Sequence, residues 1–138
     1  MRVANVMDRR FQFLAAETPI WIAQELMLRR HLNYLVVSET GETLDGLVTH
    51  ADVFRKVLPT TAEFMEKADF PSDPEAVAER YREISSLPIE SIMTTRLSTV
   101  SPSMPLLQAG ALMNARKIKQ LPVVEDSRLV GIVSYTDV

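Results

Sequence analysis

Cysteine is absent from this chain of 138 residues, and histidine occurs only twice, at His31 and His50. Without thiols the chain forms no disulfide, no thiolate metal site and no cysteine nucleophile. Neither histidine stands in a pattern of carboxylates or further histidines, so we expect no bound metal and no histidine-based triad. A glycine-rich phosphate loop that ends in Gly-Lys-Ser/Thr is also missing. These absences predict a protein that is not an enzyme.

Long apolar runs and long blocks of one charge are missing as well. No stretch approaches the ~20 apolar residues that a membrane-spanning helix needs, and the first residues lack the apolar core of a signal peptide. The 15 Lys and Arg residues face 18 Asp and Glu residues, which gives a net charge of −3. An acidic chain without a basic block has no general attraction for nucleic acid. We therefore expect a cytoplasmic protein that binds neither membranes nor nucleic acids.

An internal repeat is the strongest signal that the sequence does contain. The chain matches itself when it is shifted by 86 positions, the separation of Met7 and Met93, and such self-similarity indicates a duplicated unit. After a one-residue slip in a turn, the match continues to the end of the sequence. The matched pairs include Pro19 with Pro105, Ala23 with Ala109, Arg30 with Arg116, Leu35 with Leu121, Gly46 with Gly131 and Asp52 with Asp137.

Each copy predicts the same order of elements: strand, helix, strand, strand and helix. In the first copy, apolar residues at helical spacing predict a helix over 19–30, and Pro19 suits its first turn. Two short apolar runs, 34–37 and 44–48, flank a polar turn and predict a hairpin, and a second helix is expected at 51–58. The second copy repeats the pattern at 105–113, 121–124 and 129–133, and it stops at Val138, where its last helix is expected to begin.

This order predicts an α/β (α+β) fold of two tandem βαββα repeats, 1–58 and 89–138, the second without its last helix. The acidic segment 59–88 lies between them, and a capping-box pattern at 72–75 predicts a helix with a partly apolar stripe. A shorter helix is expected at 61–68, and the segment as a whole is interpreted as a solvated linker rather than a binding arm. The expected core includes Leu26, Met27, Leu35, Val37, Leu112, Met113, Leu121 and Val123.

One motif occurs in both copies, as Gly46-Leu47-Val48-Thr49-His50-Ala51-Asp52 and as Gly131-Ile132-Val133-Ser134-Tyr135-Thr136-Asp137. In each, a strand ends at a hydroxyl residue and a helix begins, with a carboxylate three positions further on. This pattern is typical of a helix cap with an acid that complements the helix dipole. A helix N-terminus can also bind phosphate, and a nearby acid can accept the hydroxyls of a ribose. Two copies in register favour a nucleoside phosphate site, while capping stays open for each copy alone.

With these motifs the chain resembles a tandem pair of CBS domains, the Bateman-type regulatory module named after cystathionine β-synthase. The resemblance covers about residues 3–58 and 89–138. It rests on the two Gly-to-Asp motifs, on the openings Val3-Ala4-Asn5-Val6-Met7 and Ile89-Glu90-Ser91-Ile92-Met93, and on the segments 97–100 and 119–124. It implies that the repeats pack with pseudo-twofold symmetry and leave two clefts. We also expect a homodimer in which helices of both repeats, including the one that carries Trp21, meet their symmetry mates.

The resemblance implies that each cleft takes its acid and hydroxyl from one repeat and its adenine-facing strands from the other. The first site is expected to combine Val48, Thr49, Ala51, Asp52, Leu97, Ser98, Lys119, Gln120 and Pro122. The second site is expected to combine Ile132, Ser134, Thr136, Asp137, Phe11, Gln12, Asn33 and Tyr34. The two sites are unequal, because Lys119 offers a cation to a phosphate where the other copy has Asn33.

The leading hypothesis is a regulatory sensor whose ligand is an adenine nucleotide (AMP, ADP or ATP) or an S-adenosyl compound. The alternative is a CBS pair that binds no ligand and serves as a dimeric scaffold. The presence of both acids, Asp52 and Asp137, favours the sensor, although capping also explains them in part.

Overall fold

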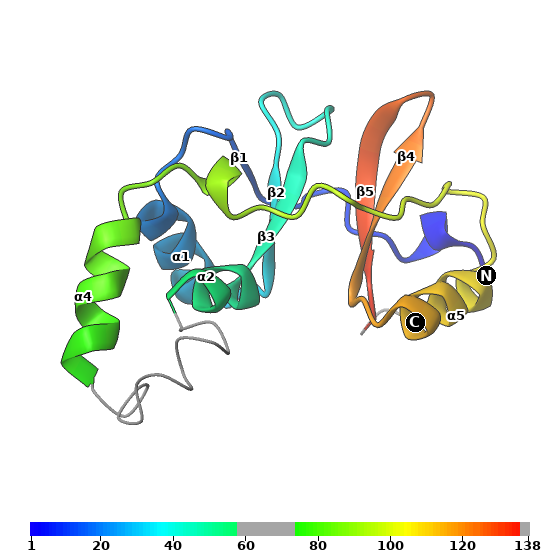
Figure 1. The fold of residues 1–138 in the computed structure, drawn as a ribbon. Helices are drawn as coiled ribbons and strands as arrows, with labels where there is room; N and C mark the ends of the chain where they lie inside the picture. Colours follow the sequence, from blue (N-terminus) through cyan, green and yellow to red (C-terminus); the bar gives the residue numbers. More distant parts are fainter. Residues whose placement is uncertain (58–73, 136–138) are drawn as a thin grey trace.

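The computed structural model describes residues 1–57 and 74–135, and it shows two halves side by side, each with its own sheet (Figure 1). The predicted α+β class is confirmed. The first half contains β1 (Phe13–Leu14), α1 (Ile20–Arg29), β2 (Tyr34–Val37), β3 (Gly46–Thr49), α2 (His50–Val57) and α4 (Pro74–Ile84). The second half contains α5 (Leu106–Arg116), β4 (Gln120–Glu125) and β5 (Arg128–Ser134). Two short 3-10 helices complete the described elements, η1 (Val3–Asn5) and η2 (Ile89–Ser91).

The first half has the predicted order of elements: strand, helix, strand, strand and helix. Strand β1 pairs in parallel with β2, and β2 pairs antiparallel with β3, with Tyr34 opposite Thr49 and Val37 opposite Gly46. The parallel pairing is possible because α1 forms the crossover between β1 and β2. Helix α1 follows Pro19, as the sequence predicts. The hairpin of β2 and β3 ends at Thr49, and α2 begins at the next residue.

In the second half, the strand that should precede α5 is reduced to a single parallel bridge between Val100 and Val123. In the first half, the Val36 N–H donates to the Gln12 carbonyl over 3.1 Å and fixes β1 to β2. The residue that corresponds to Val36 is Pro122, which has no backbone N–H to donate. The residues before α5 therefore do not form the expected strand, because the second copy lacks one of the donors that would pair this strand with β4.

The openings of the two repeats are exchanged between the halves. The segment around η1 packs against the core of the second half, where Val3 donates its N–H to the Met104 carbonyl over 2.9 Å. The segment around η2 packs in the same way against the first half, where Ile89 donates to the Thr18 carbonyl over 2.8 Å. Each half is therefore built from both repeats, so that the repeats are interlocked.

The glycine of each repeated motif makes this exchange possible. A Cβ on Gly46 would lie 2.8 Å from the sulfur of Met93, and one on Gly131 would lie 2.9 Å from the sulfur of Met7. The incoming segments also pair with the strands through two backbone hydrogen bonds each. These bonds link Leu47 with Thr94 over 2.8 and 3.0 Å, and Ile132 with Asp8 over 2.8 and 3.0 Å.

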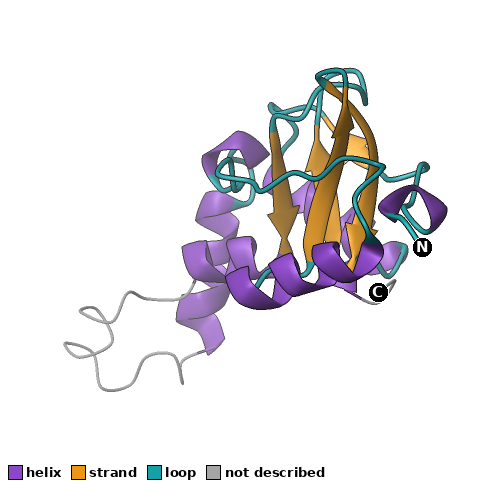
Figure 2. Ribbon diagram, turned by 90° about the vertical axis from the view of Figure 1, so that its right-hand side faces the viewer, coloured by secondary structure: helices purple, strands orange, loops and turns teal. Residues whose placement is uncertain are grey.

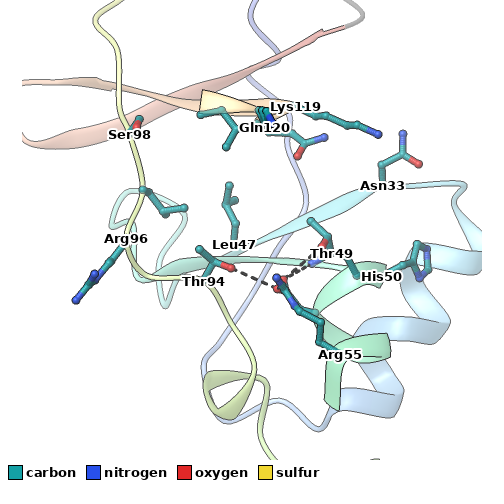
Figure 3. Close-up of a pocket in the computed structure, with 15 residues that line it drawn as sticks. Asn33, Leu47, Thr49, His50, Arg55, Thr94, Arg96, Ser98, Lys119 and Gln120 are labelled. Carbon is teal, nitrogen blue, oxygen red and sulfur yellow. Dashed lines mark hydrogen bonds and ion pairs between the residues drawn. The ribbon is translucent and has the colours of Figure 1, made fainter. Parts of the chain in front are cut away.

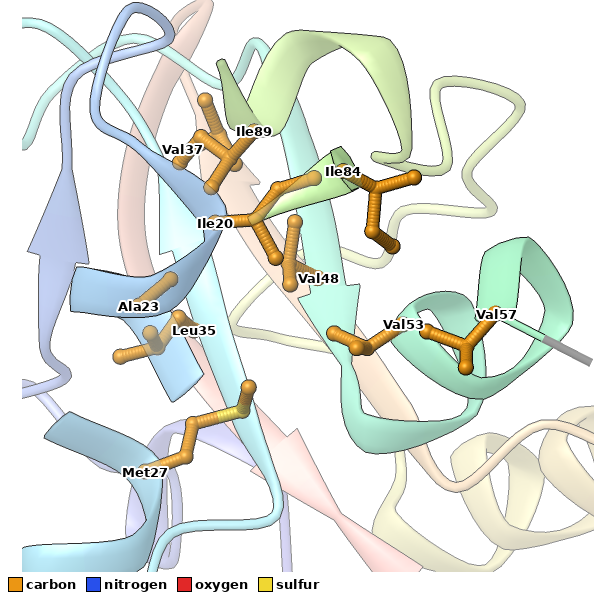
Figure 4. Packing of buried hydrophobic residues seen from close by; sticks show 10 residues of the cluster. All are labelled: Ile20, Ala23, Met27, Leu35, Val37, Val48, Val53, Val57, Ile84 and Ile89. Carbon is orange, nitrogen blue, oxygen red and sulfur yellow. The ribbon is translucent and has the colours of Figure 1, made fainter. Parts of the chain in front are cut away.

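Each half has its own apolar core, and a third cluster joins the two sheets. The first core gathers side chains from α1, the sheet, α2, α4 and η2 (Figure 4). The third cluster contains Val36, Leu47, Leu129 and Ile132, which come from β2, β3 and β5. The six residues Met27, Leu35, Val37, Met113, Leu121 and Val123 are buried as predicted. The prediction is wrong for Leu26 and Leu112, which are half-buried at the edges of the cores because their helical positions lie one residue away from the most buried stripe.

Helix α4 confirms the helix expected after the capping-box pattern, but it is not simply solvated. Its side chains Val77, Tyr81 and Ile84 pack against the first core, and Ile84 is buried. Burial, together with the nearby Glu25, raises the pKa of the Tyr81 phenol above its ordinary value. Figure 2 shows the strands of both sheets together, with helices beside and below them. The helix expected at 61–68 lies outside the described residues.

Candidate functional site

A cleft of about 570 Å³ lies between the two halves. Its lower wall in Figure 3 is formed by the end of β3 and the first turn of α2, and its upper wall by the start of β4. The segment 94–98 closes one side. The volume falls in the range of small-molecule sites, and a position between two packed units is a common place for such a site. The lining residues are Asn33, Leu47, Thr49, His50, Ala51, Asp52, Arg55, Thr94, Arg96, Leu97, Ser98, Lys117, Ile118, Lys119 and Gln120.

Asp52 is a buried carboxylate in this wall, with 5% of its surface exposed. Its Oδ2 atom accepts the backbone N–H of Thr49 over 2.9 Å and the Thr49 hydroxyl over 3.4 Å. Its Oδ1 atom accepts the Arg55 guanidinium and the Thr94 hydroxyl, the latter over 3.3 Å. The bond to the Thr49 N–H is the acidic half of a capping box, so Asp52 stabilises the start of α2. The same carboxylate faces the cleft.

The cleft is positively charged although the chain as a whole carries a net charge of −3. Among the described residues, four cationic side chains line it, from Arg55, Arg96, Lys117 and Lys119, against the single carboxylate of Asp52. The first turn of α2 adds the partial positive charge of a helix N-terminus. Walls of one sign around a low-dielectric hollow concentrate the field, so this cleft attracts anions.

Seven of the nine residues expected in the first site line this cleft: Thr49, Ala51, Asp52, Leu97, Ser98, Lys119 and Gln120. The structure places the other two elsewhere. The Val48 side chain is fully buried in the first core, because alternate residues of a strand point to opposite faces. Pro122 is buried inside β4, where its carbonyl accepts the Val100 N–H over 3.0 Å.

The residues expected in the second site fall partly outside the described part of the chain. Asn33 also lines the first cleft, beside Lys119. Phe11, Tyr34 and Ile132 belong to the apolar cluster between the sheets, and Gln12 pairs its carbonyl with β2. Ser134 lies at the end of β5, opposite Gln120. Thr136 and Asp137 lie outside the described residues.

Seven further lining residues were not expected from the sequence: Leu47, His50, Arg55, Thr94, Arg96, Lys117 and Ile118. A signal was available for Arg55, because three positions after Asp52 on a helix is the distance at which side chains meet. Lys117 also carried a signal, because it belongs with Arg116 and Lys119 to a short basic cluster of the sequence. Thr94 reaches Asp52 only through the exchange of the repeat openings, for which local patterns give no indication.

The described residues contain no group of three or more His, Cys, Asp or Glu side chains that could hold a metal ion. No helix in this part of the chain is long and apolar enough to cross a membrane.

Comparison with known proteins supports the arrangement of two repeats. The family model described as the CBS domain matches residues 3–59 and 89–138. The mitochondrial CBS domain-containing protein CBSX3 of Arabidopsis thaliana is 27% identical over 135 residues, which cover 95% of this chain. The chain spans 56% of the length of that relative.

Two solved structures show the same fold. The crystal structure of CBSX2 in complex with AMP matches with a TM-score of 0.74 at 22% identity, over 99% of this chain and 91% of that one. The CBS domain pair of protein MJ0100, in complex with 5-methylthioadenosine and S-adenosyl-L-methionine, matches with a TM-score of 0.70 at 21% identity, over 99% and 91% of the two chains.

Proposed function

Because this chain belongs to the CBS domain family and contains a tandem pair of CBS domains, we propose that it is a regulatory module that binds an adenine nucleotide in the first cleft. The observation that carries the proposal is the combination of a buried carboxylate and several cations in one hollow between the halves. A nucleotide needs both: acceptors for its ribose hydroxyls and positive charge for its phosphates.

In the proposed complex, the Asp52 carboxylate accepts the ribose hydroxyls and the first turn of α2 faces the phosphate. Lys119 and Lys117 lie on the opposite wall, from which they supply charge to the same phosphate. Leu97, Ile118 and the aliphatic part of Gln120 offer apolar surface for the base. These roles use residues from both repeats, so that a bound ligand ties the halves together.

Two relatives support this ligand class. CBSX2 is in complex with AMP, and the MJ0100 pair holds 5-methylthioadenosine and S-adenosyl-L-methionine, all of which contain adenosine. Between these ligands the charge of the cleft favours the nucleotides, because the sulfonium of an S-adenosyl compound would meet four like charges. We therefore assign AMP, ADP or ATP to the cleft rather than S-adenosyl compounds.

The proposed role is regulatory and not catalytic. A ligand that contacts both halves favours one relative arrangement of them, which a partner can sense. No group in the cleft is proposed to react with the ligand. A cytoplasmic location stays a prediction.

The direct test is a calorimetric titration of AMP, ADP, ATP and S-adenosyl-L-methionine into the protein and its Asp52→Ala variant. Loss of hydrogen bonds to a charged group, worth about 1.5–3 kcal/mol, should weaken nucleotide binding by about 10- to 100-fold. Asp45→Ala is a matched control, because Asp45 is an exposed carboxylate beside the same strand and outside the cleft.

The capping role of Asp52 predicts a different result. A helix cap contributes about 0.5–2 kcal/mol to stability, so Asp52→Ala would then lower the midpoint of unfolding while the folded protein binds nucleotide normally. Asp52→Asn helps to separate the two effects, because asparagine also caps but lacks the charge. If neither variant changes binding, the role of Asp52 as the ribose acceptor is excluded. If the protein binds no adenosine compound, the sensor function is excluded.

A second candidate function, a dimeric scaffold, is favoured by one apolar surface. Trp21, Leu28 and Phe54 are 47%, 61% and 52% exposed on α1 and α2. Together with Val77 of α4, they line an apolar hollow on the outside of the first half. We expect a homodimer through these helices, and Trp21→Glu should dissociate it. Light scattering that shows a monomer of wild type at micromolar concentration would contradict this prediction.

A further inference from the structure

The Asp52 carboxylate is saturated with hydrogen-bond donors. A carboxylate offers about four lone-pair positions to donors. Among the described residues, the Thr49 N–H and the hydroxyls of Thr49 and Thr94 account for three donors, and the Arg55 guanidinium for the fourth. A ribose that binds to Asp52 therefore has to displace at least one donor that is already present.

The four donors differ in how readily they can leave. The Thr49 N–H is fixed by the backbone at the start of α2, and the two hydroxyls are neutral and distant, at 3.4 and 3.3 Å. Arg55 is the charged donor, and its charge-assisted bond, about twice as strong as a neutral one, can be exchanged without loss only when the guanidinium gains another anionic partner. Its side chain is 70% exposed, whereas that of Asp52 is 3% exposed. The guanidinium can thus swing on its long stem while the carboxylate stays fixed.

A second position within the cleft is open to the Arg55 side chain. Arg55 lines the cleft itself, and it stands one helical turn after Asp52, on the side of α2 that faces the hollow. When a ligand takes the Oδ1 atom of Asp52, the released guanidinium remains within the cleft. A phosphate on that ligand gives it a new anionic partner, and a guanidinium binds phosphate with two parallel hydrogen bonds. An uncharged nucleoside offers no such partner.

We propose that Arg55 makes the first cleft selective for anionic adenosine derivatives over uncharged ones. Arg55 occupies the acceptor that the ribose needs, and it transfers to the phosphate when the ribose displaces it. Arg55 is thereby a specificity residue, which acts by competition on one part of the ligand and by attraction on another. This inference rests on the proposed nucleotide function and names the ligand chemistry that the site accepts.

The test compares AMP with adenosine, which lacks the phosphate, by calorimetric titration into the full chain. In Arg55→Met, which keeps the aliphatic stem, AMP should bind ~10-fold more weakly because a charge-assisted pair is lost. Adenosine should bind equally well or a few-fold more tightly, because no competing guanidinium remains on Asp52. Arg55→Lys keeps a charge and should retain most of the preference for AMP.

Arg29→Met is the matched control. Arg29 forms an exposed ion pair with Glu25 on α1 at 2.6 Å, with 77% of its side chain exposed, and it lies outside the cleft. This variant should leave both affinities unchanged. An unchanged melting midpoint of Arg55→Met, relative to Arg29→Met, shows that the fold is intact.

The outcomes separate this inference from the proposed function. If wild type binds AMP and Arg55→Met weakens AMP and adenosine equally, or changes neither, the nucleotide function stands and the role of Arg55 is refuted. If wild type binds neither compound, both fail. A fall in the ratio of AMP affinity to adenosine affinity in Arg55→Met, but not in Arg29→Met, supports the selectivity.

Discussion

The two halves of the molecule share a sequence pattern but differ at the wall of the cleft. At the point where the exchanged opening pairs with the sheet, the first half has Thr94 and the second half has Asp8, in equivalent pairs of backbone hydrogen bonds. Thr94 donates its hydroxyl to Asp52, whereas Asp8 accepts the Arg10 N–H over 2.8 Å. A hydroxyl supports the neighbouring carboxylate, and a second carboxylate in that place repels an anion. Duplication thus preserved the backbone contacts while the side chains diverged.

The difference shows which features of a duplicated fold are constrained. The backbone pairs and the glycines recur because each is needed to hold a half together. The residues that line the cleft can change without loss of the fold. Charge therefore distinguishes the halves: Lys117 and Lys119 line the first cleft, and the corresponding residues of the first repeat are His31 and Asn33.

The largest expected effect comes from the glycines, where the halves should behave alike. A Cβ at position 46 would also lie 3.0 Å from the Thr94 carbonyl, and one at position 131 would lie 3.1 Å from the Asp8 carbonyl. Methionine sulfur can move, but these backbone atoms are held by the sheet. Gly46→Ala and Gly131→Ala should each lower the free energy of unfolding by about 1–3 kcal/mol, the typical cost of overpacking. Urea unfolding measures the free energy of unfolding of both variants. A large effect in only one of them would show that the two exchanged openings do not contribute equally to stability.

The order of elements could be predicted because it depends on local patterns that occur twice. The helix after Pro19 and the hairpin that ends at Thr49 follow from apolar spacing and turn residues. Most of the first-site residues also line one cleft, since they follow from the repeated motif and the resemblance. The presence of Thr94 and Arg96 in the cleft could not be predicted from the repeated motif, because it depends on the exchange of the repeat openings. The glycines carried the only trace of that exchange, as positions where no side chain fits.

The next effect concerns the residue that ends the first helix of each repeat. His31 and Lys117 have φ angles of 52° and 54°, the left-handed conformation in which glycine is usual. In both halves the following N–H reaches back to the helix, from Leu32 to the Met27 carbonyl over 2.8 Å and from Ile118 to the Met113 carbonyl over 3.0 Å. Replacement by glycine should relieve strain and raise stability by about 0.5–1 kcal/mol in each half, after the entropy of the unfolded chain is counted.

Binding should separate these two variants. Lys117 lines the cleft, so Lys117→Gly should gain stability while AMP binds several-fold more weakly, as expected for one exposed cation near a phosphate. His31 does not line that cleft, so His31→Gly should gain stability and leave AMP binding there unchanged. Thermal unfolding and calorimetry on both variants provide the comparison. Equal losses of affinity would show that Lys117 has no special place in the first cleft.

The smallest effect on stability is expected where the halves differ most in backbone pairing. Pro122→Val restores the residue type of Val36 and supplies the missing N–H, which can donate to the Ser98 carbonyl as Val36 donates to Gln12. A hydrogen bond contributes about 0.5–1.5 kcal/mol, but loss of proline raises the entropy of the unfolded chain by about 0.4–1 kcal/mol, so the two nearly cancel. Because stability alone cannot detect the bond, hydrogen exchange is the measurement. The new amide at position 122 should be as protected as the Val36 amide, since both would then lie in a parallel ladder. An amide that exchanges freely in the folded variant would show that the second half lacks its first strand for a reason other than Pro122.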